Sequence, residues 1–441
     1  MSPQAQFKAL VDGLSAALTG RERFTLGYQA EVSDFVRLNH ASVRQAGHVS
    51  QASATLKLID EGRHADLEFT LCGDADTDRE RLAEALQRLR QTLPLLQPDP
   101  YLRLNEDAWH SHSVQDTPLP ASTEAIERIT GLADGLDLVG IYAAGPIYRG
   151  FASSWGAWGW HEASSFNFDW SLFHANGEAV KANYAGADWQ DEAFARRFAQ
   201  AREQLAHLGG TPMRLAPGQY RAYLAPAALE EVVSMLGWGG FSARALATHS
   251  SPLQRLYDGG ACLDARVSFS ERVSGSLSPA FSGEGYPRRD LSLVAEGRGV
   301  ERLVGSRSAA EYGLAANGAV AWEAPSALSM GAGTLPLDEV PQRLGTGLYI
   351  GNLWYLNYSD RPAARLTGMT RFATFWVEDG RIQAPVAAMR FDDSVYSLLG
   401  DALEDLTQER ELLLSTSTYS QRDTSSNLLP GALLERLTLT L

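Results

Sequence analysis

The feature that most constrains the fold is a pair of strand-like segments in the second half of the chain. Residues 348–358 and 370–377 are dense in aromatic and β-branched side chains, which suit a pleated, half-buried surface. Residues 359–362 form a polar connection, and the Asp-Gly pair within residues 378–381 is typical of a tight hairpin turn. This region is therefore expected to form a hairpin-rich sheet.

The same segments carry many polar residues for a strand pair. Asparagine, threonine and arginine side chains alternate with tryptophan, tyrosine and phenylalanine throughout residues 352–376. Such a mixture fits either a sheet with one wet face or a surface that holds an extended ligand, and composition alone leaves both interpretations open.

The length and charge of the chain limit the classes of function. A chain of 441 residues exceeds one ordinary core, so we expect two domains, residues 1–208 and residues 209–441. With 38 basic and 53 acidic residues, the net charge is −15, and no basic stripe compensates for it. This disfavours binding to nucleic acid or to an anionic membrane as a partner.

The cysteine count and the amino-terminal sequence indicate the compartment. Cys72 and Cys262 are the only cysteines, so a disulfide framework is not expected, and both are interpreted as small buried residues. The first residues lack the basic and apolar regions of a secretory signal, and no apolar run is long enough to cross a membrane. These features predict a cytoplasmic protein.

The pattern of the first half predicts an α+β domain of helices and antiparallel strands. Apolar spacing predicts helices at residues 3–19, 77–92, 124–132 and 192–208, and strands at residues 24–32, 35–43, 50–59, 65–72, 137–142, 147–151 and 164–173. An Asp-Glu-Gly turn at residues 60–62 would join two of these strands. The regular βαβ alternation of a doubly wound sheet is missing.

The second half is predicted to be β-rich. A strand at residues 218–224 precedes a helix at residues 227–246, which three glycines at 237, 239 and 240 interrupt. Besides the hairpin described above, further strands are expected at residues 265–269, 291–296, 303–305 and 433–441, and helices at residues 308–312 and 394–406.

Three groups of histidines invite a metal or catalytic interpretation. His161 and Glu162 begin like a zinc helix, but no second histidine follows four or five residues later. His110 and His112 could chelate a metal from alternate strand positions, although two solvated loop histidines are the commoner case.

A nucleophilic site is the remaining option. His249 beside Ser250, or Cys262 by itself, could supply one, but sequence neighbours do not establish the geometry that catalysis requires. The glycine-rich run 237–240 lacks an adjacent Lys-Ser/Thr pair, so it is interpreted as a site of close backbone packing.

Four stretches, in chain order, carry the motifs of one family. They are residues 35–59 with Asn-His-Ala at 39–41, residues 217–246 with Pro-Gly-Gln-Tyr at 217–220, residues 288–318 with Leu-Ser-Leu-Val at 291–294, and residues 347–380 with Thr-Gly-Met-Thr-Arg-Phe at 367–372. Through these stretches the chain resembles the TldD/PmbA family, whose members are described as cytosolic metallopeptidases and as modulators of gyrase. The resemblance implies an α+β protein with a β-rich second domain.

The resemblance also implies what the chain lacks. Members pair as dimers that enclose a cavity for unfolded or short peptides, and the TldD-type subunit carries HExxxH on the helix after the strand that matches residues 218–224, with a Cys ligand further on. The matching helix here contains no histidine, and no cysteine follows Cys262. The chain is therefore similar to the TldE side of the family or to a divergent TldD-related branch, with no metal ligand, cofactor or catalytic residue expected of its own.

Three functions follow as hypotheses. The first is a non-catalytic subunit that encloses peptides beside a zinc-bearing TldD-type partner. The second is a homodimeric binding or scaffold protein without hydrolytic activity, and the third is a hydrolase that uses His249, Ser250 or Cys262. The candidate peptide-binding residues all lie in the hairpin region: Asn352, Tyr355, Asn357, Arg365 and Arg371.

Overall fold

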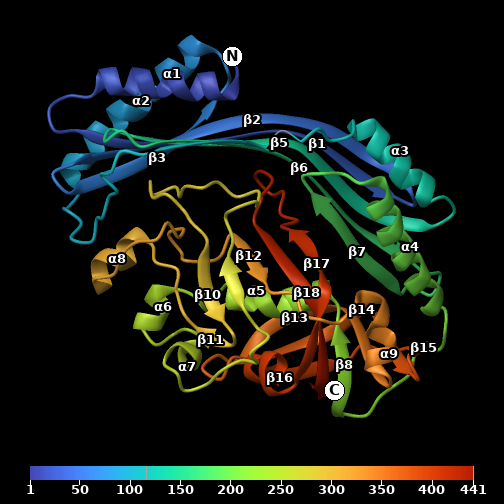
Figure 1. Ribbon diagram of the computed structural model, residues 1–441. Coiled ribbons are helices and arrows are strands. Elements are labelled where there is room, and N and C mark those ends of the chain that lie inside the picture. Colours follow the sequence, from blue (N-terminus) through green and yellow to red (C-terminus); the bar gives the residue numbers. More distant parts are fainter. Residues whose placement is uncertain (116, 441) are drawn as a thin grey trace.

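The structure is a computed structural model that describes residues 1–115 and 117–440. It contains two large sheets: a seven-stranded sheet from the first half of the chain and an eleven-stranded sheet from the second. In Figure 1 the first sheet arches over the second, and helices pack on both. The predicted α+β class, with a β-rich second half, is confirmed.

The seven-stranded sheet is a mostly antiparallel layer built from long strands. Its order is β3-β2-β1-β5-β6-β4, with β7 also paired to β6. Only β4 runs parallel to its neighbour. The strand bounds are β1 Arg23–Asn39, β2 Ser42–Asp60, β3 Arg63–Leu71, β4 His110–Gln115, β5 Asp137–Ser153, β6 Trp158–Phe173 and β7 Ala179–Gly186.

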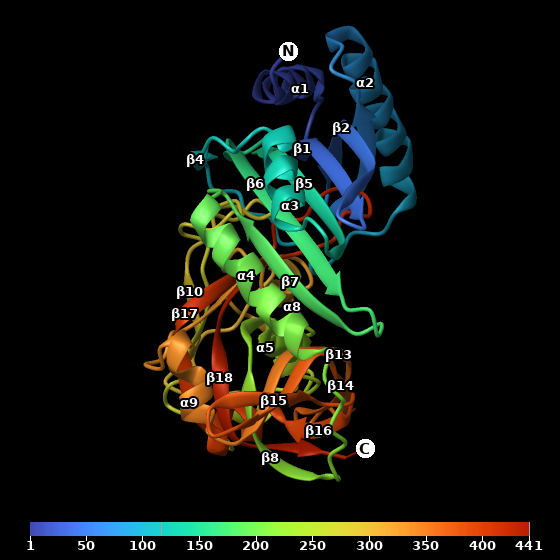
Figure 2. The same cartoon turned by 90° about the vertical axis from the view of Figure 1, so that its right-hand side faces the viewer.

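Four helices cover this sheet. Figures 1 and 2 place α1 Pro3–Ala17 and α2 Ala75–Thr92 together at one end, on the outer face. Their buried apolar residues, such as Phe7 and Leu86, join a core with β1 and β2. At the other end, α3 Ser122–Leu132 and α4 Asp191–His207 pack on an aromatic core that includes Phe168 and Trp170. α2 begins two residues earlier than predicted, after the N-cap Asp74, whose carboxylate accepts from the Thr77 amide.

Five strands of the second sheet close into a ring. β8 Gly218–Leu224, β13 Gly347–Asp360, β14 Arg365–Glu378, β16 Arg390–Ser394 and β18 Ser426–Leu439 pair in this order, and β18 pairs back onto β8. Closure leaves no free edge among these five strands. Apolar residues of the ring and of α5 Pro226–Leu236 form the largest core of the molecule.

The remaining elements extend this ring on its outside. The strands are β9 Phe269–Glu271, β10 Leu291–Ala295, β11 Arg298–Gly299, β12 Ala327–Met330, β15 Arg381–Pro385 and β17 Leu403–Leu414. The helices are α6 Ala243–Ala247, α7 Gln254–Tyr257, α8 Ser306–Tyr312 and α9 Val340–Leu344. A lipid bilayer could not be crossed by any helix within the described residues, because none combines the length and apolar character needed.

The two hairpin turns predicted from their residues are present in the structure. The Asp-Gly hairpin is confirmed, with Asp379 and Gly380 both in the left-handed region, at φ 49° and 72°. The turn at Glu61-Gly62 between β2 and β3 has the same form. The predicted glycine break is also present: α5 ends at Leu236, and α6 begins as a separate helix at Ala243.

Two predicted strands are in fact one. The segments 24–32 and 35–43 form the single strand β1, which ends at Asn39, and Val43 lies in β2. The polar pair between the segments does not break the strand because both side chains have partners. Ser33 donates to Glu31, and Asp34 lies opposite His48 of β2, with His48 Nδ1 2.8 Å from its carboxylate.

The helix predicted at residues 394–406 is wrong. β16 ends at Ser394, a short π-type turn spans Ser397–Asp401, and β17 begins at Leu403. Gly400 has φ −122° and ψ −114°, which no helix accommodates, and pairing with β18 holds the following residues extended. The apolar residues that suggested a helix are instead buried around this turn.

Two short predicted strands are also wrong. In segment 265–269, Asp264 folds the chain back by accepting from the Arg266 amide, so only Phe269 is in a strand. In segment 303–305, Leu303 makes one isolated bridge with Ser242. The predicted strand at residues 433–441 falls within β18 up to Leu439, and Leu441 lies outside the described residues.

The loop between β17 and β18 connects the two sheets. Figure 1 shows it rising from the second sheet toward the first. Arg422 in this loop is 4% exposed and lies beside Glu31, with further hydrogen bonds to Ser33, Ser165 and the Gly145 carbonyl. The loop therefore fixes the second half of the chain to the face of the first sheet.

Candidate functional site

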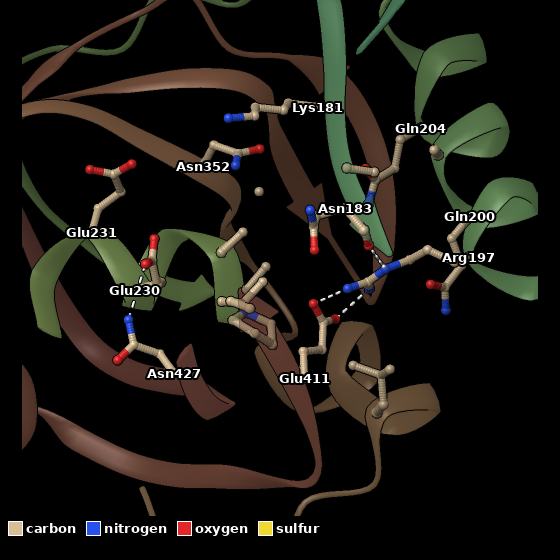
Figure 3. Close-up of a pocket in the computed structure, with 18 of the residues that line it drawn as sticks. Lys181, Asn183, Arg197, Gln200, Gln204, Glu230, Glu231, Asn352, Glu411 and Asn427 are labelled. Carbon is tan, nitrogen blue, oxygen red and sulfur yellow. Dashed lines mark hydrogen bonds and ion pairs between the residues drawn. The ribbon is translucent and has the colours of Figure 1, made fainter. Parts of the chain in front are cut away.

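A cavity of about 670 Å³ lies where α4 and β7 of the first half meet α5, β13 and β17 of the second. Its wall contains both charged and apolar side chains, and Figure 3 shows the main polar ones. This volume falls within the usual range for small-molecule and peptide pockets. Because it is formed by both halves, the cavity depends on how the two sheets are held together.

One wall of the cavity is the polar face of α5. The helix begins with Pro226, whose missing amide hydrogen costs nothing in a first turn, and it follows directly after β8. Its apolar face, which includes Val232 and Val233, is buried in the core. The opposite face presents Glu230, Glu231 and Ser234 to the cavity, since residues three or four apart share one side of a helix.

The two carboxylates of this wall have different surroundings. Glu230 accepts from the Asn427 side chain at 3.1 Å and from Ser234 at 3.2 Å. Glu231 has no hydrogen-bond or ion-pair partner among the described residues. Burial, together with the neighbouring Glu230 carboxylate, raises the pKa of Glu231 to about 7, whereas Lys181 opposes the shift.

The opposite wall is built around an ion pair between the two halves. Arg197 of α4 donates two hydrogen bonds to the Glu411 carboxylate of β17. Beside it, Gln204 of α4 donates to the Tyr349 hydroxyl of β13 at 3.2 Å. Burial raises the pKa of Tyr349 to about 12, so this hydroxyl is neutral at physiological pH. Both contacts join α4 to the second sheet across the cavity.

Some polar atoms of the cavity wall lack a protein partner in the described chain. The Tyr223 hydroxyl of β8 is fully buried without a hydrogen bond, and the Asn183 side-chain oxygen of β7 is also unsatisfied. Asn352 of β13 is 9% exposed, lines the cavity, and makes no side-chain hydrogen bond with any described residue. Unpaired buried polar groups cost free energy, so they are uncommon unless something else binds them.

The structure separates the five candidate peptide-binding residues. Asn352 lines the cavity, whereas the other four are not among the described residues of its wall. Tyr355 is 78% exposed, Arg365 pairs with Asp392, and the Arg371 guanidinium stacks 4.6 Å from the centre of the Trp354 ring. Asn357 accepts from the amide of the next residue. These four lie on the outer part of the hairpin.

None of the histidines considered in the sequence is among the described residues of the cavity wall. His161 is 2% exposed in β6, its Nε2 is 3.0 Å from the Leu277 carbonyl, and burial lowers its pKa. His110 and His112 are exposed on strand β4. His249 is exposed in a loop, where Ser250 is 3.0 Å from the Thr248 hydroxyl. No hydrogen bond joins His249 to Ser250 in the described structure.

Both cysteines are exposed, so the prediction that they are buried is wrong. Cys72 comes directly after β3, where its amide donates to Asp78 as the chain turns toward α2. Cys262 follows the Gly259-Gly260 loop. Both cysteines lie in connections between elements of secondary structure.

The cavity does not provide the ligands of a zinc centre. Its described lining residues include no histidine and no cysteine. Across residues 1–115 and 117–440, no three side chains of the His, Cys, Asp or Glu type form a group that could hold a metal ion. Zinc in proteins is bound mainly by histidine and cysteine, so the donor set present does not fit this metal.

Sequence reasoning missed most of this cavity. Glu230 and Glu231 are adjacent on a predicted helix, and their polar spacing was the only signal available for them. Arg197, Glu411 and Lys181 carried no signal, because their proximity arises only when α4, β7 and β17 meet.

Comparisons with known proteins agree with this fold. The family model described as the PmbA/TldA metallopeptidase C-terminal domain matches residues 217–440. TldE from Thermococcus kodakarensis is similar in structure, with a TM-score of 0.78 and 14% identity over 99% of this chain and 100% of that chain. A candidate modulator of a DNA gyrase from Thermotoga maritima gives a TM-score of 0.74 and 14% identity over 98% of this chain and 100% of that chain.

A search of curated proteins finds no significant match. The structural likenesses, at 14% identity, establish the shared fold. The family model covers just over half of the chain and includes the α5 wall, the Asn352 strand and Glu411. The resemblance noted in the sequence is thus confirmed, and the chain belongs to the PmbA/TldD family.

Proposed function

We propose that this chain is the non-catalytic, metal-free subunit of a cytoplasmic TldD/TldE-type peptidase, and that its cavity holds an unfolded or short peptide. In this proposal a TldD-type partner carries the zinc and cuts the peptide. The observation that supports it is a cavity of about 670 Å³, formed by both halves of the chain, whose described wall offers carboxylates and amides but no histidine or cysteine.

The character of the wall suits a peptide. The unpaired side-chain amide of Asn352 can bind main-chain amides regardless of side-chain sequence. Apolar residues, including Val340 and Leu413, line the same space and can contact side chains. Tyr355, Asn357, Arg365 and Arg371 lie outside the described wall of this cavity, so their contact with a peptide is untested.

The test measures zinc content and peptidase activity. The purified chain is assayed alone and together with a HExxxH-bearing homologue from the same source, using an unfolded peptide as substrate. We expect no stoichiometric zinc and no cleavage from the chain alone, and cleavage from the mixture. The matched control is the same homologue with both motif histidines replaced by alanine.

Two results would contradict the proposal. Stoichiometric zinc with cleavage by the lone chain would make it a self-sufficient peptidase. A chain that binds peptides as a homodimer and forms no complex with the homologue would instead support the second hypothesis, a scaffold that holds peptides without cutting them.

A further inference from the structure

The charges of the cavity wall are unbalanced. It contains six carboxylates and two cationic side chains. Both cations are already paired: Lys181 lies 3.6 Å from Asp169, and Arg197 binds Glu411. Four carboxylates of the described wall therefore have no cationic partner: Glu203, Glu230, Glu231 and Asp338. Such a wall attracts a cation and repels a carboxylate or phosphate.

Two of these four carboxylates, Glu230 and Glu231, lie next to each other on α5. Figure 3 shows Glu230 and Glu231 of α5 on the side of the cavity away from Arg197 and Glu411, with Asn352 and Lys181 above. Glu230 already accepts two hydrogen bonds from the protein, whereas Glu231 accepts none from any described residue. Of these two carboxylates, Glu231 is therefore the one that is free to bind a ligand.

Asn352 provides an independent indication of a ligand at this end. The residue is about nine-tenths buried, lines the cavity, and makes no side-chain hydrogen bond with any described residue. A buried amide of this kind normally has a partner, and its side-chain oxygen can accept from a cationic N–H group. Carboxylate and amide oxygens together suit an ammonium group, which carries several donors and no acceptor.

We propose that the Glu231 end of the cavity binds the ammonium group of a peptide, with Glu231 as the counter-charge and Asn352 as a neutral acceptor. This inference rests on the proposed peptide-holding function and specifies which chemical group of the peptide is recognised. Two sources share this chemistry: the free amino terminus and a lysine side chain. The experiment separates them.

The test is calorimetric titration of the full-length chain, at about pH 7.4, with three forms of one short unstructured peptide. The first form has a free amino terminus and no lysine. The second is the same peptide with an acetylated terminus, and the third is acetylated and contains one lysine. We expect the second form to bind at least about tenfold more weakly than the first or the third, and the tighter of those two identifies the source.

Two variants complete the test. Glu231→Gln keeps the shape of the side chain and removes its charge, so it should weaken the ammonium-bearing forms about tenfold and leave the acetylated, lysine-free form nearly unchanged. Glu192→Gln is the matched control, because Glu192 is an exposed carboxylate of α4 outside the cavity wall, and it should bind all forms like the parent chain. Circular dichroism confirms that both variants are folded.

The outcomes distinguish ammonium recognition from the proposed peptide-holding function. If all three forms bind equally well, or if Glu231→Gln weakens all three equally, ammonium recognition is overturned while peptide holding stands. If none of the three forms binds, both the inference and the peptide-holding function fail.

Discussion

Arg422 lies against Glu31, with its Nε 3.8 Å from the carboxylate, although 391 residues separate them in the chain. Both side chains are almost completely buried, and the guanidinium also donates to Ser33 and to the Ser165 carbonyl. A buried cation with this many partners is well satisfied, but removal of the cation leaves the carboxylate without compensation. The contact therefore determines how firmly the two sheets hold each other.

The first prediction concerns this contact. Arg422→Ala should destabilise the protein by about 3–5 kcal/mol, because it removes the ion-pair partner of the buried Glu31 carboxylate. Arg436→Ala is the matched control, since Arg436 pairs with a largely exposed Asp401, and it should cost no more than about 1 kcal/mol. Chemical denaturation measures both. Equal effects of the two substitutions would mean that the Arg422 loop does not contribute to holding the halves together.

The second prediction compares the buried Tyr223, whose hydroxyl has no hydrogen-bond partner in the described chain, with the half-buried Tyr257, whose hydroxyl has one. Tyr223→Phe should leave stability unchanged or raise it by about 1 kcal/mol, because its hydroxyl is buried without a partner. Tyr257→Phe should lower stability by about 1–3 kcal/mol, since its single O–H donates either to the Leu293 carbonyl at 3.0 Å or to the Glu301 carbonyl at 2.8 Å. Thermal unfolding of both variants tests this. A loss of stability in Tyr223→Phe would show that its hydroxyl has a partner in solution.

The third prediction is a pH dependence due to Glu231. Its pKa rises from 4.5 to about 7 on folding, so the folded state favours the protonated carboxyl, and this contribution is lost as the pH rises through 7. Glu231→Gln should therefore match the parent chain near pH 4 and exceed its stability at pH 8. The gain should be about 1–2 kcal/mol after allowance for solvent screening. Glu192→Gln should show no such divergence, and a constant difference at every pH would contradict the assignment.

The fourth prediction separates the five hairpin candidates. Asn352→Ala should weaken peptide binding by about tenfold, because Asn352 alone among them lines the cavity. Tyr355→Ala and Arg371→Ala should change the affinity by less than about twofold, since these side chains lie on the outer part of the hairpin. The same titration measures all three. If Tyr355→Ala weakens binding as much as Asn352→Ala, the peptide must also contact the outside of the hairpin.

Features encoded by neighbouring residues were predictable from the sequence. The Asp379-Gly380 turn, the strand that became β8 and the end of α5 all depend on backbone preferences within a few residues. The helix expected at residues 394–406 failed because its apolar spacing suits either a helix or a buried turn followed by a strand. Pairing between β17 and β18 decided in favour of the strand.

The candidate site was only partly predictable, because most of its residues come together only through contacts between distant parts of the chain. Asn352 was selected because polar residues are uncommon in an aromatic strand, and this signal is local. Arg197 and Glu411 are 214 residues apart and meet only in the folded chain, so neither could be identified without the structure. The sequence predicted peptide-binding residues in both strands of the hairpin, but only the part of β13 and β14 that includes Asn352 contributes to the cavity.

The closed ring of the second sheet has a consequence for biosynthesis. β8 is made early in this half, yet its ring is incomplete until β18 emerges and pairs with both β8 and β16. The first sheet, by contrast, has all its strands once β7 is made. On a ribosome that adds about 5–20 residues each second, the first sheet can form while the nascent second half still exposes apolar strands. We expect this interval to be when the chain most needs a chaperone.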